Sequence, residues 1–225
     1  MPINVSDLHK YIDHTLLKAD AKPEDIEKLC REAIEHSFFS VCVNGSHAAL
    51  AAKLLSGSSV KTGVTVGFPL GAMHHSVKAF EAGKAIEDGA GEIDFVMNIG
   101  ALKAGNLALA EEDMRAVRKA CSSPVLLKVI LETCLLTADE ITQACKIALH
   151  AGIDFVKTST GFSSGGATVE HISLMRSTVG PDMGVKAAGG IRTTADALAM
   201  LGAGATRLGT SGGISIIKGE SIKGY

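Results

Sequence analysis

The sequence of 225 residues contains no tryptophan and only two tyrosines. Proteins that bind single-stranded nucleic acids stack bases on aromatic side chains, and this chain has few such side chains. Its formal net charge of −2 indicates no basic surface for nucleic acid or for an anionic membrane. We therefore expect neither nucleic acid nor a membrane among its partners.

Long apolar runs and paired cysteines are also missing. No uncharged apolar stretch reaches the roughly 18 residues of a membrane span, and residues 1–4 have neither the basic nor the apolar region of a secretory signal. The five cysteines are odd in number and none has CxxC spacing, which argues against a disulfide framework or a zinc site. The sequence predicts a cytoplasmic protein.

Short apolar runs alternate with amphipathic segments along the whole chain. The predicted strands are residues 11–14, 40–44, 60–66, 93–97, 125–130, 155–157, 184–186 and 205–208. The predicted helices are residues 23–36, 47–55, 76–88, 107–120, 138–150, 169–179 and 195–201, with a short eighth helix after Gly212. Thr137 and Glu140 predict a capping box, and Gly89, Gly152 and Gly202 are placed to end helices in a left-handed conformation.

Strict alternation of strand and helix predicts a parallel sheet covered by helices. Eight units in 225 residues give about 28 residues per unit, which suits a compact (β/α)8 barrel. An open doubly wound sheet would require a glycine-rich turn after its first strand, and residues 13–18 contain no glycine. We predict an α/β protein with a (β/α)8 TIM barrel fold and one domain over residues 1–225.

Charged residues interrupt four of the predicted buried strands. Lys128, Lys157 and Lys186 are separated by 29 residues each, the length of one strand–helix unit, and Asp94 lies on the preceding strand. The equal spacing predicts that the three lysines occupy a similar position along their strands. A structural ion-pair network is one interpretation of this pattern. A catalytic site is the other, because barrel enzymes carry reactive groups at the carboxyl ends of their strands.

An amine next to an acid suits imine chemistry on a carbonyl group. Lowering the pKa of an ordinary lysine from about 10.4 by about 3 units takes roughly 4 kcal/mol. A second ammonium about 5 Å away supplies roughly 3 kcal/mol at an effective dielectric constant of about 20, and partial burial supplies the remainder. A neutral lysine is a nucleophile for carbonyl carbon, and Asp94 is available to move protons.

Two glycine-rich loops follow the last two predicted strands. Gly189 and Gly190 follow the seventh strand, and residues 209–213 follow the eighth and open the short last helix. Such loops also form ordinary turns, but in barrels the bare N–H groups at this place often bind a phosphate group. The combined pattern predicts a phosphorylated carbonyl compound as the ligand.

Seven stretches along the chain resemble the deoxyribose-phosphate aldolases, a family of class I aldolases. They are residues 12–18, 41–44, 64–71, 92–100, 127–133, 154–161 and 185–192. The resemblance implies that Lys157 forms the Schiff base, that Lys186 is the ammonium favouring its neutral form, and that Asp94 relays protons with a water. It also implies the residues that hold the 5-phosphate: Thr160, Gly161, Gly189, Gly190, Gly209 and Ser211.

The implied reaction is the reversible cleavage of 2-deoxy-D-ribose 5-phosphate to D-glyceraldehyde 3-phosphate and acetaldehyde, in the catabolism of deoxyribonucleotides. No metal and no organic cofactor is expected, because the imine takes the place of a Lewis acid. His74 and His75 are adjacent and lack a carboxylate-rich partner motif, so we expect no metal there. Another phosphosugar lyase or isomerase, or a silent barrel that binds phosphometabolites, remains the alternative.

The chain departs from some relatives at two places. Some relatives carry a lysine that contacts phosphate directly after the Thr-Gly of the sixth strand, where this chain has Phe162. Some relatives also have a C-terminal tyrosine that reaches the site, and Tyr225 is a candidate for that role. Lys128 and Cys42 are further candidates at strand ends, Cys42 being alternatively a small buried residue. The family resemblance also implies a homo-oligomer, dimeric or larger.

Overall fold

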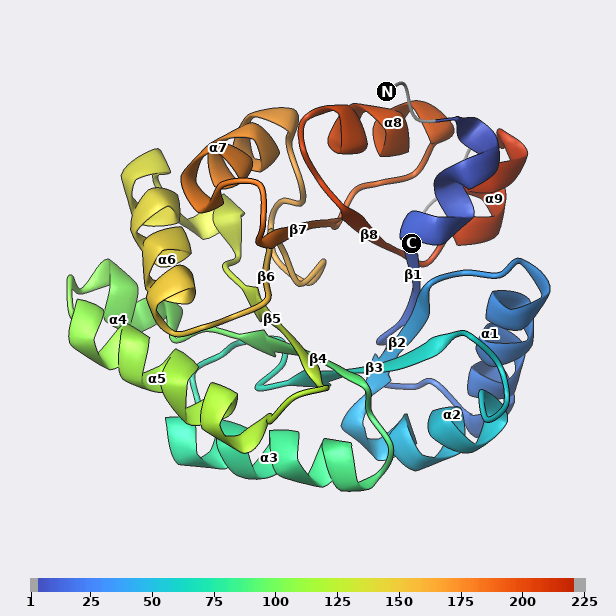
Figure 1. The fold of residues 1–225 in the computed structure, drawn as a ribbon, viewed down its shortest axis with the longest axis horizontal. Helices are drawn as coiled ribbons and strands as arrows, with labels where there is room; N and C mark the ends of the chain where they lie inside the picture. The colour runs from blue at the N-terminus through green and yellow to red at the C-terminus, as the bar shows by residue number, and fades with distance from the viewer. Residues whose placement is uncertain (1–3, 221–225) are drawn as a thin grey trace.

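A computed structural model of the chain describes residues 4–220, which form a closed barrel of eight parallel strands inside a ring of helices (Figure 1). The strands are β1 (Ile12–Leu16), β2 (Ser40–Asn44), β3 (Lys61–Val66), β4 (Glu92–Val96), β5 (Leu126–Ile130), β6 (Phe155–Lys157), β7 (Gly184–Ala188) and β8 (Arg207–Thr210). Each strand pairs with the next in sequence, and β8 pairs with β1. The predicted (β/α)8 fold is confirmed, with strand ends shifted by at most two residues.

The helices lie outside the barrel and cover the sheet (Figure 1). They are α1 (Pro23–Glu35), α2 (Ala48–Leu54), α3 (His75–Glu87), α4 (Ile99–Lys103), α5 (Leu107–Ala120), α6 (Ala138–His150), α7 (Val169–Val179), α8 (Thr194–Gly202) and α9 (Gly213–Lys218). Residues 4–220 also form the 3-10 helices η1 (Val5–Tyr11), η2 (Gly45–His47) and η3 (Thr133–Leu135). The sequence does not predict α4, because five residues are too few to show a helical period. Over residues 4–220, no helix is both long enough and apolar enough to cross a bilayer.

The predicted capping signals act at three helix ends. Thr137 accepts a hydrogen bond from the backbone N–H of Glu140 (3.2 Å), and the Glu140 carboxylate accepts one from the N–H of Thr137 (2.8 Å). Gly89 and Gly152 end α3 and α6 with φ angles of 99° and 69°. At positive φ a Cβ atom clashes with the backbone. Glycine has no Cβ atom, which explains its presence at both positions.

The predicted end of α8 at Gly202 is wrong in detail. Gly202 is the last residue of the helix, Ala203 is its right-handed C-cap, and the left-handed residue is Gly204 with φ 113°. A Cβ atom at position 204 would lie 2.6 Å from Cγ of Arg176. The chain therefore uses its glycine where it passes Arg176 and not directly after the last apolar residue of the helix.

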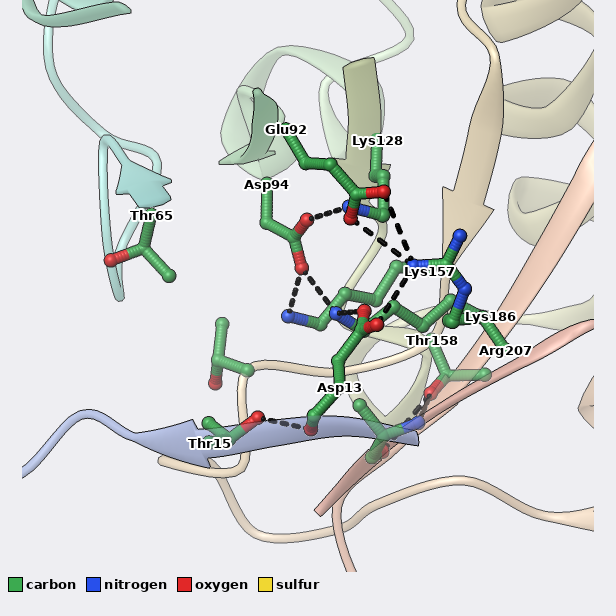
Figure 2. A network of polar contacts seen from close by, with 12 residues as sticks. Asp13, Thr15, Thr65, Glu92, Asp94, Lys128, Lys157, Thr158, Lys186 and Arg207 are labelled. Carbon is green, nitrogen blue, oxygen red and sulfur yellow. Dashed lines mark hydrogen bonds and ion pairs between the residues drawn. The ribbon is translucent and has the colours of Figure 1, made fainter. Parts of the chain in front are cut away.

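Strand β4 shows how the barrel separates apolar from charged side chains. Successive side chains of a strand point to opposite faces. Ile93 and Phe95 belong to the apolar core that includes the layer between sheet and helices, whereas Glu92 and Asp94 point into the barrel (Figure 2). All five residues of the strand are buried. The charged side chains are therefore enclosed by the sheet and cut off from bulk water.

Candidate active site

The four charged residues that the sequence singles out meet inside the barrel (Figure 2). The ammonium groups of Lys157 and Lys186 donate hydrogen bonds to Oδ2 of Asp94 at 2.9 Å and 2.7 Å. Lys128 donates to Oδ1 of Asp94 at 2.8 Å. One carboxylate therefore joins three lysines from three successive strands.

The equal spacing of the lysines predicts their positions only in part. In the register of the sheet Lys157 lies opposite Lys186, as predicted. Lys128 lies opposite Phe155, whereas Ile130 lies opposite Lys157. The prediction is thus wrong for Lys128, which is two residues further from the carboxyl end of the sheet. The reason is the stagger that closes a tilted barrel, which separates β5 from β6 but not β6 from β7.

Three further charged residues extend this cluster inside the barrel. Lys186 lies 2.5 Å from Oδ2 of Asp13, and Lys128 lies 2.6 Å from Oε2 of Glu92. Arg207 joins the two acids, because its Nη1 lies 2.8 Å from Asp13 and 3.1 Å from Glu92. The seven residues, here called the barrel-interior network, are Asp13, Glu92, Asp94, Lys128, Lys157, Lys186 and Arg207.

Of these three residues, only Glu92 carried a local sequence signal that the prediction did not use. Glu92 precedes Asp94 by two positions and so shares its face of β4. Arg207 lies opposite Lys186 in the register of β7 and β8. Asp13 lies within the first of the stretches shared with the aldolase family, but only the folded barrel brings it to Lys186.

Opposite charges in the network overcome the effect of burial. Burial favours the neutral form of Asp94, but Lys128, Lys157 and Lys186 outweigh it and hold the pKa of the carboxyl well below its usual value. Burial likewise opposes the charge of Lys186, but Asp13 and Asp94 raise its pKa above the usual value. Lys128 also has a raised pKa, because Asp94 and Glu92 outweigh burial. These three groups are therefore charged at neutral pH.

The network contains three carboxylates and four basic groups, so that full ionisation leaves one positive charge in excess. Lys128, Lys186 and Arg207 each contact two carboxylates. Among the carboxylates of residues 4–220, Lys157 forms an ion pair with Asp94 alone. Lys157 is therefore the basic group of the network with the fewest carboxylate contacts.

Lys157 also reaches a pocket at the carboxyl end of the strands. All six predicted substrate-binding residues line this pocket together with Lys157, whereas Asp94, Lys128 and Lys186 lie beneath it. The complete lining is Thr15, Lys157, Thr160, Gly161, Phe162, Ala188, Gly189, Gly190, Ile191, Arg192, Gly209, Thr210 and Ser211. The pocket thus exposes one amine of the network to a ligand.

The glycines of this pocket are required by the backbone. Gly161, Gly189 and Gly190 have φ angles of 87°, 83° and 80°, which side chains disfavour. A Cβ atom on Gly209 would lie 3.0 Å from Cε of Lys186. Gly209 therefore leaves room for Lys186 on the neighbouring strand. The other three glycines shape the loops around the pocket.

The lining includes Phe162, at the position where some relatives carry a lysine that contacts phosphate. Phe162 is half exposed, and its ring meets that of Phe68 edge to face, with 5.3 Å between centroids. Arg192 is a cationic residue that lines the pocket, and the sequence prediction does not include it as a site residue. Its signal was its place directly after the glycine pair and Ile191 in one of the shared stretches.

The remaining candidates lie elsewhere. Cys42 is buried on β2 and does not line the pocket, and burial together with the nearby Asp94 raises the pKa of its thiol. Tyr225 lies outside the described residues. Nδ1 of His74 accepts a hydrogen bond from the N–H of Ser76 and so caps α3. In the part of the chain that the structure describes, no group of three or more His, Cys, Asp or Glu side chains is arranged to hold a metal ion.

Comparisons with known proteins show which family the chain resembles. Residues 8–218 match the family described as DeoC/LacD family aldolase. The chain is 61% identical to the deoxyribose-phosphate aldolase of Streptococcus gordonii, over 96% of this chain and 98% of that protein. It is 60% identical to that of Streptococcus pneumoniae serotype 19F, with the same coverage. The tetrameric structure of deoxyribose phosphate aldolase from Aeropyrum pernix has a TM-score of 0.89 and 33% identity, covering 96% of this chain and 91% of that chain.

Proposed function

The chain belongs to the DeoC/LacD family of aldolases, and we propose that it works as a class I enzyme through an imine on Lys157. Its activity is that of a deoxyribose-phosphate aldolase, an aldehyde-lyase. The reaction divides 2-deoxy-D-ribose 5-phosphate into acetaldehyde and D-glyceraldehyde 3-phosphate. The roles given below to individual residues are our proposal.

One observation carries the assignment of the nucleophile. Lys157 is the basic group of the barrel-interior network that contacts a single carboxylate, and it is also the one that lines the pocket. Lys128 and Lys186 are each held by two carboxylates beneath the pocket. The amine with the fewest carboxylate contacts is therefore the one that a ligand can reach.

The phosphate end of the substrate is assigned to the loops after β7 and β8. Gly189 and Gly190 bring bare backbone to the pocket, and Gly209 and Ser211 line it from the next strand. Arg192 adds a positive charge on the same side, which we assign to the phosphate in place of the lysine missing at Phe162. A phosphate held there leaves the aldehyde end of the sugar to extend toward Lys157.

The chemistry begins with attack of Nζ of Lys157 on C1 of the open-chain aldehyde. Loss of water gives a protonated imine, which draws electrons from the C2–C3 bond as the C3 hydroxyl loses its proton. D-glyceraldehyde 3-phosphate leaves, and C2 of the remaining enamine takes up a proton. Water then hydrolyses the imine, which releases acetaldehyde and restores Lys157. Asp94 contacts both Lys157 and Lys186 and is assigned to carry protons with a water.

The substitution Lys157→Arg tests this mechanism, because arginine retains the positive charge but forms no imine. We expect the turnover number to fall by roughly five orders of magnitude, with the protein still folded. Lys103→Arg is the matched control, since Lys103 forms a partly exposed ion pair with Glu140 outside the pocket. Full cleavage by Lys157→Arg would overturn the imine mechanism and favour another type of phosphosugar lyase.

We also propose that the chain forms a dimer or a larger homo-oligomer. The relative from Aeropyrum pernix is described as tetrameric. Leu70, in the β3–α3 loop, and Val77 and Phe80, on α3, are 74%, 50% and 76% exposed, and large exposed apolar groups often mark contact surfaces. Light scattering on the purified protein tests the proposal, and the mass of a single chain at micromolar concentration would contradict it.

The cytoplasm is the compartment that we propose for the enzyme. All five cysteines are unpaired in the structure, and four of them are buried. Free thiols of this number suit a reducing compartment. Fractionation of cells with an antibody against the chain tests the assignment, and recovery outside the cytoplasmic fraction would contradict it.

A further inference from the structure

Glu132 is a buried acidic residue near the pocket to which the mechanism above gives no role. It follows β5 by two positions, is 3% exposed, and has φ 57° and ψ 60°. Residues other than glycine seldom adopt this left-handed conformation, and those that do are concentrated at functional sites. The position therefore combines two costs, a buried charge and a disfavoured backbone conformation.

The carboxylate of Glu132 is held by a single pocket residue through two contacts. Its Oε2 accepts a hydrogen bond from the hydroxyl of Thr160 at 2.5 Å, and its Oε1 accepts one from the backbone N–H of Thr160 at 3.2 Å. A buried carboxylate is costly unless such bonds replace water. The contacts thus tie the residue after β5 to the loop after β6.

The backbone on either side of Glu132 runs along the end of β6. The N–H of Leu131 donates to the carbonyl of Lys157, and the N–H of Thr133 donates to the carbonyl of Thr158, both at 2.9 Å. Glu132, which lies between Leu131 and Thr133, adds a side-chain contact further along the same segment, at Thr160. The left-handed conformation of Glu132 thus accompanies a continuation of strand pairing beyond the end of the sheet.

Thr160 connects Glu132 to the loop of residues 160–162 at the pocket. Its hydroxyl donates to Glu132 and accepts a hydrogen bond from the N–H of Phe162 at 3.0 Å. Gly161 lies between them, and a Cβ atom on Gly189 would lie 3.7 Å from the Cα of Gly161. The loop of residues 160–162 therefore packs beside the glycine pair that we assign to the phosphate.

We propose that Glu132 is a positioning residue that sets the preference for phosphorylated substrate by holding residues 160–162 against the phosphate loop. This proposal rests on the function proposed above. Glu132 acts through Thr160 and does not line the pocket itself. Lys157 is placed by the pairing of β6 with β5 and β7, which does not involve the Glu132 side chain. Loosening the loop should therefore weaken phosphate recognition and leave imine formation intact.

The test compares deoxyribose 5-phosphate with unphosphorylated 2-deoxyribose in the variant Glu132→Gln. We expect KM for the phosphorylated sugar to rise about tenfold, as for loss of one hydrogen bond to a charged group. The kcat for this sugar and the kcat/KM for 2-deoxyribose should stay within about twofold of the parent values, since Lys157 keeps its contacts. An unchanged KM, or an equal loss with both sugars, would overturn the proposal.

Two further variants separate positioning from general stability. Glu140→Gln is the matched control, because Glu140 also exchanges hydrogen bonds with a threonine, Thr137, but lies on α6 away from the pocket. It should lower stability and leave both KM values unchanged. Thr160→Val combined with Glu132→Gln should raise the KM no more than the larger single change, because both variants break the same contact. Additive effects would contradict the proposed linkage.

Two outcomes distinguish a failure of this proposal from a failure of the function on which it rests. If borohydride traps no imine on Lys157 in the parent enzyme, the proposed function fails, and with it the role of Glu132. If the imine is trapped and Glu132→Gln retains full preference for the phosphorylated sugar, only the role of Glu132 fails. Glu132→Asp, which withdraws the carboxylate by one methylene, provides the same comparison if the glutamine variant does not fold.

Discussion

Within residues 4–220, one cluster of buried charges lies inside the barrel and another lies between α3 and α5. The second consists of Lys78 and Asp113, both fully buried, whose ammonium nitrogen lies 2.8 Å from Oδ1 and 2.9 Å from Oδ2. Backbone groups complete it, because Lys78 donates to the carbonyl of Val96 and Asp113 accepts from the N–H of Asn98, each at 2.8 Å. Both clusters are withdrawn from water to a similar degree.

The pKa values in the two clusters nevertheless move in opposite directions. Burial raises the pKa of Asp113 and lowers that of Lys78, because the opposite charges near each group, chiefly its partner in the pair, do not offset the loss of water. Asp94 contacts three ammonium groups, which outweigh the same penalty and lower its pKa. The number of opposite charges around a buried group, more than its burial, therefore decides whether it stays ionised.

The two clusters also differ in charge balance and in access to ligand. Lys78 and Asp113 are equal and opposite, and neither lines the pocket. The barrel-interior network has one basic group more than it has acids, and the least paired of these, Lys157, faces the pocket. An unbalanced network with an open side can perform chemistry, whereas the balanced and closed pair joins α3 and α5 to each other and to the backbone at the end of β4.

Among the variants that test the comparison of the two clusters, Asp94→Asn should produce the largest effect, because it changes both catalysis and stability. The turnover number should fall by about 10² to 10⁴ through loss of the proton carrier. The free energy of unfolding should fall by about 3 to 5 kcal/mol, because three buried ammonium groups lose their shared anion. Steady-state kinetics and urea unfolding measure the two quantities. Asp88→Asn, in the surface pair with Lys84, is the control that should change neither appreciably. Unaltered stability of Asp94→Asn would show that the network does not depend on this charge.

Lys78→Met should have a smaller effect that is confined to stability. It leaves Asp113 buried without its partner and should cost about 3 kcal/mol of unfolding free energy. The double variant Lys78→Met with Asp113→Leu should recover most of this loss, since an apolar pair removes the desolvation penalty. The turnover number should stay at the parent value in both variants. A low turnover number in the double variant, despite recovered stability, would connect this pair to catalysis. It would contradict the distinction between a catalytic network and a structural ion pair.

The smallest expected effect is a pair of opposite pH dependences. Lys186 and Arg207 outweigh burial and lower the folded-state pKa of Asp13. Its stabilisation is therefore complete above the unfolded value of about 3.9 and is lost as the pH falls through the lower folded pKa. Asp113 has a raised folded pKa, so the folded state gains stability as the pH falls through that value toward about 3.9.

Urea unfolding between pH 3 and 7 (roughly the range in which carboxyl groups titrate) measures these slopes. The stability difference between the parent and Asp13→Asn should stay constant at the upper end and shrink below about pH 4. The difference between the parent and Asp113→Asn should instead grow in favour of the parent as the pH falls. If the stability difference between parent and variant changed with pH in the same direction for Asp13→Asn and Asp113→Asn, the opposite pKa directions would be contradicted.

The fold was predictable because its signals are local. The apolar run before Lys157 and the capping box of Thr137 and Glu140 each involve only neighbouring residues, and the repetition of such units indicates a barrel. Register is not local, since it depends on the stagger needed to close the sheet. This is why the spacing of 29 residues placed Lys157 and Lys186 side by side correctly but misplaced Lys128.

The missed parts of the site depend on contacts between distant strands. Arg207 stands at the beginning of β8, where a basic residue resembles an ordinary surface group, and its partner Asp13 is 194 positions away in the sequence. Glu132 is similar, because its partner Thr160 lies beyond the next helix and no sequence pattern indicates a left-handed glutamate. The alternation of Glu92 with Asp94 was a usable local signal.

The imine on Lys157 is tested most directly by borohydride trapping. The parent protein is incubated with acetaldehyde or deoxyribose 5-phosphate, reduced, digested, and examined by peptide mass spectrometry. We expect a single adduct on Lys157, with Lys128 and Lys186 unmodified although all three contact Asp94. An adduct on Lys128 or Lys186 instead, or no adduct on folded protein that still binds phosphate, would contradict the assignment of Lys157 as the nucleophile.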